Sequence, residues 1–170
     1  EKDIERLNII SERFNKIGSK PKLEKANLYD EIEGTIDYLG ARLSKKIKIE
    51  FHHSKKEIYV KLNKQLFSWS LENIIKNSID AIKEKGKVSI KVIKADEYVK
   101  IHIIDNGVGI DKSIRNKIFS PGITTKERGW GLGLSLAKRI IEEYHNGEIK
   151  VVESDVDKGT EMMIKLKGIE

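Results

Sequence analysis

Apolar residues recur at helical spacing in four stretches of the chain. Residues 4–17 carry one apolar stripe at spacings of three and four, which predicts an amphipathic helix that ends near Gly18. Similar stripes predict helices within 28–43, over 64–84 and over 134–144. A lone amphipathic helix such as the first must pack its apolar face against another surface.

Shorter stretches alternate between apolar and polar residues and predict strands. They cover 47–51, 57–62, 87–94, 97–104, 148–153 and 160–166. A short polar turn joins the first two, and the next two form a hairpin around Ala95 and Asp96. Strands interleaved with helices on one face predict an α+β fold. We expect a two-layer α/β sandwich with a mixed or antiparallel sheet and an N-terminal amphipathic helix.

The predicted elements divide the chain into one compact domain and a short appendage. Residues 19–27 hold one of only two prolines and almost no large apolar side chains, so they are expected to be a linker between 1–18 and 28–170. Inside the domain, residues 105–133 contain six glycines and at most one helical turn, around 114–119. A loop this long in a compact domain is usually functional or disordered.

Composition narrows the classes of partner. The 33 basic and 27 acidic residues are interspersed and leave a net charge of +6, which is typical of a solvated surface. The basic residues are 27 Lys against 6 Arg, and aromatics make up only 6%, so we expect no nucleic-acid partner. The absence of Cys excludes disulfides, thiolate metal sites and Cys nucleophiles. No apolar run approaches the roughly 18 residues that span a membrane.

The long predicted helix carries a polar stripe of Asn73, Asn77 and Asp80 beside its apolar residues. Most such stripes are solvent faces. Two asparagines in mid-helix are poor helix formers, however, and the other exposed faces here are Lys and Glu. A carboxamide oxygen suits Mg²⁺, which takes the rest of its ligands from water and phosphates. The stripe is therefore a candidate magnesium site, with a plain solvent face as the alternative.

Residues 105–109, Asp-Asn-Gly-Val-Gly, follow directly on the apolar strand that ends at Ile104. A tight turn at a strand end is the simpler explanation of this pattern. A carboxylate fixed at a strand end can instead accept the amino hydrogens of a purine, while the glycines let the ring approach the backbone. By itself the signal is weak.

Residues 129–134, Gly-Trp-Gly-Leu-Gly-Leu, open the last predicted helix. Backbone N–H groups at a helix start bind phosphate, and glycines let the phosphate approach. The segment is neither a Walker loop, which ends in Gly-Lys-Ser/Thr, nor a dinucleotide fingerprint, which follows a strand. Just before it, Thr124, Thr125 and Lys126 offer hydroxyls and an ammonium for a terminal phosphate, although a lone loop Lys is more often solvated.

In this order, the pieces resemble the N, first glycine, F and second glycine boxes of the catalytic ATP-binding domain of sensor histidine kinases. That family belongs to the GHKL ATPase superfamily, with type II DNA topoisomerases, mismatch-repair ATPases and a heat-shock chaperone. The resemblance covers about residues 28–167, and Gly159 and Thr160 match the Gly-Thr that closes the adenine pocket. It implies a Bergerat-type fold that binds ATP with Mg²⁺ under a mobile lid, here about 111–131.

The resemblance assigns roles position by position. Asn77 matches the Mg²⁺-binding asparagine, Asn73 a phosphate-lining residue one turn earlier, and Asp105 the aspartate that recognises the adenine amino group. Lys126 matches a γ-phosphate contact and completes the implied catalytic set with the two asparagines. Asp80 departs from many of these kinases, which place a basic residue there, so its role stays open. The other implied nucleotide-binding residues are Gly107, Gly109, Ile110, Thr124, Thr125, Gly129, Gly131, Leu132, Gly133, Leu134 and Thr160.

The N box also distinguishes branches of the superfamily. Relatives that hydrolyse ATP place a glutamate, as general base, where Asn73 stands, and an amide cannot take a proton from water. A neutral imidazole already offers a lone pair, so phosphoryl transfer to histidine depends mainly on positioning and charge neutralisation. The resemblance thus implies a protein-histidine kinase with feeble direct ATP hydrolysis.

None of the four histidines matches the family's phosphoacceptor, a His followed by an acidic residue on a helix. We expect His52, His53, His102 and His145 to be structural or solvent-facing. Residues 1–18 instead resemble part of the second helix of the dimerisation and phosphoacceptor hairpin. The histidine-bearing first helix is therefore expected to be missing, and the fragment to be inactive alone.

The resemblance further implies relay of the phosphoryl group from that missing histidine to the receiver domain of a response regulator. It implies a homodimer in the full-length protein and a cytoplasmic location for this domain, compatible with an inner-membrane anchor elsewhere. One alternative is a serine-directed anti-sigma-type kinase or nucleotide-binding regulatory module of the same superfamily, against which the lead-in helix at 1–18 argues. A degenerate scaffold that has lost its nucleotide is another.

Overall fold

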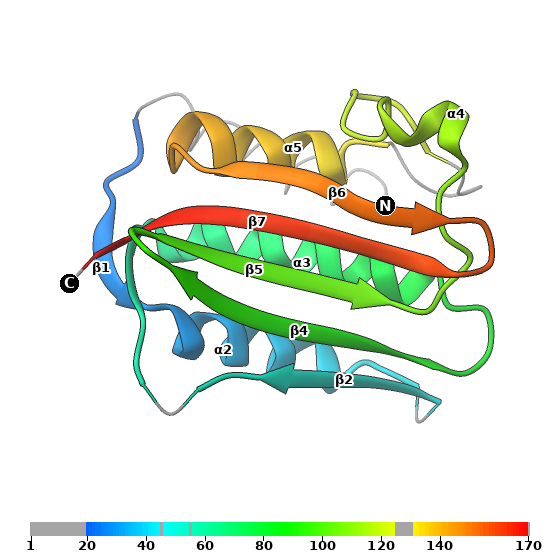
Figure 1. The fold of residues 1–170 in the computed structure, drawn as a ribbon, viewed down its shortest axis with the longest axis horizontal. Helices are drawn as coiled ribbons and strands as arrows, with labels where there is room; N and C mark the ends of the chain where they lie inside the picture. Colours follow the sequence, from blue (N-terminus) through cyan, green and yellow to red (C-terminus); the bar gives the residue numbers. More distant parts are fainter. Residues whose placement is uncertain (1–19, 45, 55, 125–130, 170) are drawn as a thin grey trace, which may run out of the picture.

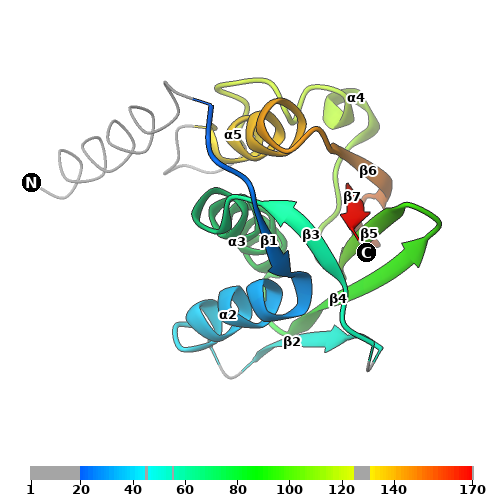
Figure 2. The same ribbon diagram turned by 90° about the vertical axis from the view of Figure 1, so that its left-hand side faces the viewer.

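Helices cover one face of a mixed sheet, so the molecule has two layers (Figures 1 and 2). The computed structural model describes residues 20–44, 46–54, 56–124 and 131–169. This two-layer α+β architecture confirms the fold class expected from the sequence. In chain order the elements are β1 (Glu24–Asn27), α2 (Leu28–Gly40), β2 (Ile47–His52), β3 (Tyr59–Leu62), α3 (Lys64–Asp80), β4 (Gly86–Ala95), β5 (Tyr98–Asp105), α4 (Lys112–Arg115), α5 (Gly133–Arg139), the π-helical turn η1 (Ile140–Tyr144), β6 (Glu148–Asp155) and β7 (Gly159–Ile169).

Within the described residues the strands form a seven-stranded sheet in the order β1-β3-β7-β5-β4-β2, with β6 paired to β7. The pair of β2 and β4 is parallel and the other described pairs are antiparallel. The predicted hairpin of 87–94 and 97–104 is confirmed as β4 and β5, with Ala95 opposite Tyr98. Strands β6 and β7 form a second hairpin, which contains a bulge near Val151.

The strands predicted at 47–51 and 57–62 are both present, but they do not pair with each other. Ile47 in β2 lies opposite Gly86 in β4, and β3 pairs with β1 and β7. The polar residues between them therefore connect two strands that are not neighbours in the sheet. Alternation in the sequence determines which face of a strand is buried, but it does not determine which strand becomes the neighbour.

The predicted linker 19–27 contains a short strand. Residues 24–27 form β1, which pairs antiparallel with β3 and buries Ala26 against the core. The prediction missed it because a four-residue edge strand with charged side chains has almost no apolar pattern. The helix expected at 4–17 and the boundary after residue 18 lie outside the described residues, so the division into 1–18, 19–27 and 28–170 stays a prediction.

Two helix boundaries and the type of one helical turn differ from those predicted. Helix α3 ends at Asp80 rather than at residue 84, because the carbonyl of Ala81 accepts the N–H of Val108 and the chain turns toward β4. The predicted turn at 114–119 is the short helix α4, capped by Asp111. The predicted helix 134–144 is α5 followed by the π-turn η1.

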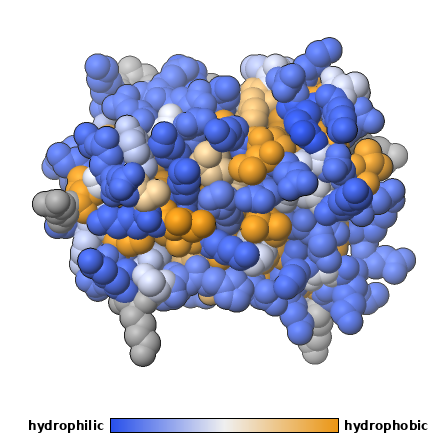
Figure 3. Space-filling model, in the orientation of Figure 1, coloured by the Kyte–Doolittle hydropathy of each residue, from blue (hydrophilic) through white to orange (hydrophobic). Residues whose placement is uncertain are grey.

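The core lies between the inner face of the sheet and helices α2, α3 and α5. Phe67, Leu71 and Ile74 of α3 and Ile101 and Ile103 of β5 are among its fully buried side chains. None of the described helices covers the outer face, which is mostly hydrophilic with scattered apolar side chains (Figures 2 and 3). No helix among the described residues is long and apolar enough to cross a membrane. Helix α3 thus lies at the centre of the helical layer, where both neighbouring helices and the sheet can reach it.

Candidate functional site

Asn73 lies where α3 meets the first residues of α5. The side chain is half-buried, and its Nδ2 is fully buried without a hydrogen-bond partner among the described residues. A Cβ added at Gly133 would lie 3.2 Å from Asn73 Oδ1. The structure therefore brings the first predicted amide and the glycine-rich helix start together, and it leaves an amide donor at their junction.

Asn77 and Asp80 follow along the same helix. Asn77 is half-buried one turn beyond Asn73, and Asp80 is exposed at the end of α3. Residues four apart on a helix lie on one face, so both asparagines occupy the stripe predicted from the sequence.

Asp105 is held at the end of β5 by three donors. Its Oδ1 accepts the N–H of Gly107 at 2.9 Å, and the Ser78 hydroxyl and the Thr160 N–H also bond to the carboxylate. The residue is only 6% exposed, and this burial raises the pKa of Asp105 above its usual value, against the opposing effect of the three donors. A carboxylate has about four acceptor sites. At least one acceptor site is therefore left for the N–H of a ligand.

The two halves of the predicted site share helix α3. Asn73 contacts the start of α5, and Ser78 contacts Asp105. The two contact points are about 7.5 Å apart along the helix axis, at about 1.5 Å per residue. The structure thus places the amides, the carboxylate and the glycine-rich helix start around one stretch of α3.

Gly107 and Gly109 are required by the chain's own backbone. A Cβ at Gly107 would lie 2.6 Å from the carbonyl oxygen of Ala81. Gly109 has φ +71°, and a Cβ there would collide with the carbonyl oxygen of Asp155. From the sequence, these glycines are expected to let a purine ring approach the backbone. The close approach seen is instead between protein segments, and their contact with a ligand stays a prediction.

A buried hydroxyl network supports the loop after β5. The N–H of Ile110 donates to Ser154 Oγ at 2.8 Å, and Ser154 bonds to Thr160 Oγ1 at 2.8 Å and to the Gly159 carbonyl at 3.0 Å. Ser154 is 1% exposed. Ser78 and Ser154 were not predicted as site residues, because a small polar residue in a hydrophobic pattern carries no signal of the partner it meets.

The two sides of the predicted lid meet at Gly122 and Gly131. The Gly122 N–H donates to the Gly131 carbonyl at 3.0 Å, and Gly131 has φ +63°. A Cβ at Gly131 would lie 2.6 Å from the carbonyl carbon of Gly122, so only glycine fits there. Thr124 is exposed just beyond this contact. Thr125, Lys126 and Gly129 lie outside the described residues, so their roles stay predictions.

Helix α5 begins at Gly133 without a side-chain cap. Leu132 is at the capping position, and the Ser135 hydroxyl donates to the Leu132 carbonyl rather than to a free N–H group. Leu134 packs against the core. Among the described residues, no capping side chain therefore takes the first N–H groups of α5, as expected for a helix start that binds an anion.

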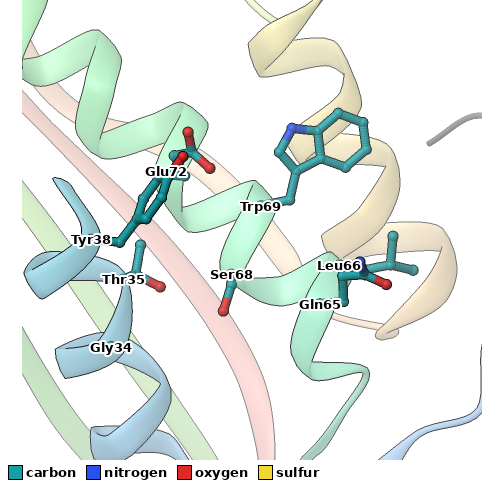
Figure 4. Close-up of a pocket in the computed structure, with 8 residues that line it drawn as sticks. All are labelled: Gly34, Thr35, Tyr38, Gln65, Leu66, Ser68, Trp69 and Glu72. Atoms are coloured by element: carbon teal, nitrogen blue, oxygen red, sulfur yellow. The ribbon is translucent and has the colours of Figure 1, made fainter. Parts of the chain in front are cut away.

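A separate cavity of about 360 Å³ lies between α2 and α3 (Figure 4). The Tyr38 ring extends from α2 toward Glu72 on α3. The lining residues are Gly34, Thr35, Tyr38, Gln65, Leu66, Ser68, Trp69 and Glu72. None of them is a predicted site residue, so this cavity is a competing location for a ligand.

Sequence comparison places the chain among ATPases. Residues 62–169 match the sequence model of the family described as histidine kinase-, DNA gyrase B- and HSP90-like ATPase. The chain is 33% identical to sporulation kinase D of Bacillus subtilis (strain 168) over 172 residues, which cover 98% of the chain and 33% of that protein. It is 43% identical over 93 residues to the signal transduction histidine-protein kinase AtoS of Escherichia coli (strain K12), covering 54% of the chain and 15% of AtoS.

Solved structures with a similar fold include histidine kinases. The nucleotide-free catalytic domain of the histidine kinase ThkA superposes with a TM-score of 0.78 at 27% identity, over 86% of this chain and 96% of that one. ThkA in complex with the response regulator TrrA gives a TM-score of 0.76 at 23% identity, over 99% of this chain and 49% of that one. The chain spans about a third of the length of sporulation kinase D and less of AtoS.

Proposed function

The chain belongs to the family of histidine kinase-, DNA gyrase B- and HSP90-like ATPases, and from this membership we propose that residues 28–170 are the catalytic ATP-binding domain of a sensor histidine kinase. One observation carries the proposal: Asn73, Asp105 and the glycine-rich start of α5 are arranged around one stretch of α3. The similarity to AtoS, sporulation kinase D and ThkA favours a histidine kinase over a serine-directed relative.

Asp105 recognises the adenine ring in this proposal. Its carboxylate keeps an acceptor site after bonding to Gly107, Ser78 and Thr160, and that site can take a hydrogen of the adenine amino group. The partners that hold the carboxylate come from the loop, from α3 and from β7. The acceptor is thus fixed before the nucleotide arrives, which lowers the cost of binding.

The phosphates lie toward the other end of this stretch of α3. The buried Nδ2 of Asn73, which has no hydrogen-bond partner among the described residues, is a donor suited to a phosphate oxygen. The start of α5, which no described side chain caps, supplies backbone N–H groups. The backbone at Gly131 and Gly133 is proposed to line the phosphates, and Lys126 is proposed to contact the γ-phosphate.

Mg²⁺ fits the donor chemistry of this site. The described residues contain no group of three His, Cys, Asp or Glu side chains that could hold a metal ion. The amide oxygen of Asn77 is proposed as the protein ligand, in agreement with the preference of Mg²⁺ for a few protein oxygens plus phosphates and water. Bound there, Mg²⁺ supplies neutralisation of the negative charge on the phosphates.

Phosphoryl transfer is favoured over hydrolysis at this site. An amide at position 73 cannot act as a general base for water, so the residues of the site position the nucleotide without activating a water molecule. None of the chain's four histidines lies within a helix. We therefore place the phosphoacceptor histidine on a helix outside this sequence.

The proposed function as a histidine kinase also implies two protein partners. The solved complex of ThkA with the response regulator TrrA supports a receiver domain as the final phosphate acceptor for this kinase. A second copy of the full-length protein is the other proposed partner, through the helical hairpin to which residues 1–18 would belong.

The proposal is tested by mixing the chain with ATP, Mg²⁺ and a separate hairpin that carries an acceptor histidine. Mg²⁺-dependent ATP binding, no phosphorylation of the chain alone and transfer to the hairpin are expected. Vigorous steady-state hydrolysis without transfer would assign the chain to another branch of the superfamily. Absence of ATP binding would identify a degenerate scaffold.

A further inference from the structure

The His145 side chain joins the start of α3 to the end of η1. Its Nε2 accepts the backbone N–H of Asn63 at 3.0 Å, and its Nδ1 bonds to the carbonyl of Ile140 at 2.8 Å. The residue is 6% exposed, and its ring packs edge-on against Phe67 with centroids 6.5 Å apart. The imidazole thus links the start of α3 to the end of η1, and the bonded residues Asn63 and His145 are 82 residues apart in sequence.

The two bonds define the protonation state of the ring. A backbone N–H can only donate and a carbonyl can only accept, so Nδ1 carries the proton and Nε2 is bare. Burial lowers the pKa of His145, and the bond to the Ile140 carbonyl opposes this only in part. The bridge therefore exists only with a neutral ring, because a proton on Nε2 would face the Asn63 N–H.

The π-turn directs the ring toward α3. The backbone N–H of His145 donates to the same Ile140 carbonyl at 3.2 Å, and the Gly147 N–H donates to the Ile141 carbonyl at 2.8 Å. Asn146 between them has φ +50°, which ends the helix. A single π-turn in an α-helix often marks a functional place.

Helices α3 and α5 are fastened to each other at two places. At one, Gly133 packs on Asn73; at the other, His145 holds Asn63. The helices run antiparallel, and the two places are about 15 Å apart along α3, at about 1.5 Å per residue. The contact between His145 and Asn63 therefore helps to determine the position of the glycine-rich start of α5 along α3.

We propose that His145 is a positioning residue of the nucleotide site: its neutral ring holds α5 in register on α3, and its protonation at acidic pH loosens the contact between Gly133 and Asn73. Nucleotide affinity then falls with acidification while the chain stays folded. The inference rests on the proposed function, because it assigns the spacing of α3 and α5 to ATP binding.

The charged groups on the elements around the ring have other partners. Lys64 at the start of α3 pairs with Glu31 at 2.8 Å. In η1, Glu143 pairs with Arg139 at 3.1 Å and Glu142 with Lys138 at 3.6 Å. Glu148 at the start of β6 pairs with Lys150 at 3.1 Å. Among the described residues, the ring's own hydrogen bonds are to backbone groups.

The test compares His145→Gln and His145→Leu. Gln keeps an acceptor and a donor but does not titrate near neutral pH, whereas Leu removes both. Affinity for a fluorescent ATP analogue with Mg²⁺ is measured from pH 8 to about pH 4.5, with circular dichroism at each pH to confirm folding. His102→Gln is the matched histidine control, because His102 bonds to Glu161 on the outer face of the sheet. Val99→Ala, in the sheet core, controls for lost stability.

In the wild-type chain and in His102→Gln, affinity is expected to fall only at a pH below about 6.5, the ordinary pKa of histidine, because burial lowers the pKa of His145. The His145→Gln chain should bind with little dependence on pH. His145→Leu should bind about tenfold more weakly at every pH, from the unpaired Asn63 N–H and the loosened helix. Hydrogen exchange at residues 133–136 should rise in the same variant, with or without nucleotide.

Two results would overturn the inference. One is a wild-type pH profile that His145→Gln leaves unchanged. The other is a His145→Leu chain that binds as tightly as Val99→Ala. If the wild-type chain binds no nucleotide at any pH, the proposed function fails, while faster exchange at 133–136 in His145→Leu would still support the link between the two helices.

Discussion

At the scale of single residues, Asp105 combines a buried charge with an unfilled acceptor site. Its raised pKa means that the ionised form is disfavoured in the fold. The stability that Asp105 contributes is therefore fully present below its unfolded pKa and is lost as pH rises through the folded pKa. At neutral pH the carboxylate is retained at a cost in stability, which its proposed contact with adenine explains.

Asp105→Asn should weaken ATP binding by about 10- to 100-fold, because the amide places a donor where the adenine amino group needs an acceptor. At pH 7 the free energy of unfolding should stay within about 1 kcal/mol of the wild type, since removal of the buried charge offsets weaker bonds to its donors. Calorimetric titration with ATP and GTP and urea unfolding measure the two quantities. Unchanged ATP affinity and base preference would contradict the role of Asp105.

Gly109 and Gly34 provide a matched pair. Gly109 has φ +71° and no room for a Cβ, whereas Gly34 is in helix α2 with no atom within 4 Å of its Cβ position. Gly109→Ala should lower the free energy of unfolding by about 3 kcal/mol, from backbone strain and overpacking. Gly34→Ala should raise it by about 0.5–1 kcal/mol. Urea denaturation tests both, and equal effects would contradict this account of the glycine-rich loop.

The chemistry of the site could be predicted from single residues, but the contacts of those residues could not. Asn73, Asn77 and Asp105 carry amide and carboxylate groups whose ligands follow from chemistry and from their order along the chain. The partners of Asp105, such as Ser78 and Thr160, depend on how α3 and β7 pack against β5. The sequence contains the donors but not the tertiary arrangement that brings them to one carboxylate.

At the scale of elements, helix α3 depends on its first turn as well as on its buried face. Asn63 Oδ1 accepts the Leu66 N–H at 3.1 Å, and its Nδ2 donates to the Lys22 carbonyl at 3.3 Å. The backbone N–H of the same residue donates to Nε2 of His145. The cap thus fixes the helix on which the whole proposed site is arranged.

Asn63→Ala should lower the free energy of unfolding by about 1 kcal/mol, because the Leu66 N–H loses its side-chain acceptor. Asn63→Ser should stay within about 0.5 kcal/mol of the wild type, since serine caps nearly as well. Thermal and urea unfolding of both variants make the comparison. An alanine variant as stable as the serine variant would show that the cap contributes little.

The elements themselves could be predicted better than their neighbours. Strong periodicity located α2, α3 and the hairpin of β4 and β5. The pairing of β2 with β4, which are separated by β3 and α3, follows from packing of the whole sheet. Strand β1 has one buried apolar residue in four, which is too short a pattern to detect.

At the scale of the molecule, the proposed site and the cavity between α2 and α3 are two candidate ligand locations on one helix. Glu72 lines the cavity and Asn73, its neighbour, lies at the junction with α5. Adjacent residues on a helix point about 100° apart, so Glu72 and Asn73 point to different sides of α3. The two locations can therefore be separated by experiment.

Asn77→Ala should lower affinity for ATP with Mg²⁺ by at least about tenfold, and the variant should show no further loss when Mg²⁺ is removed. The reason is that the alanine chain lacks the amide proposed to hold the ion. Glu72→Ala, at the cavity, is the control and should bind as the wild type does. Equal losses in the two variants would refute the assignment of the metal ligand.

The most direct test of the account is a map of amide chemical shifts as a non-hydrolysable ATP analogue with Mg²⁺ is added to the whole chain. The account predicts the largest shifts at residues 73–78, 105–110, 131–134 and 160, with little change at Gly34, Thr35 and Tyr38. Shifts concentrated at those last residues and at 65–69, with none around Asp105 and Gly133, would contradict it.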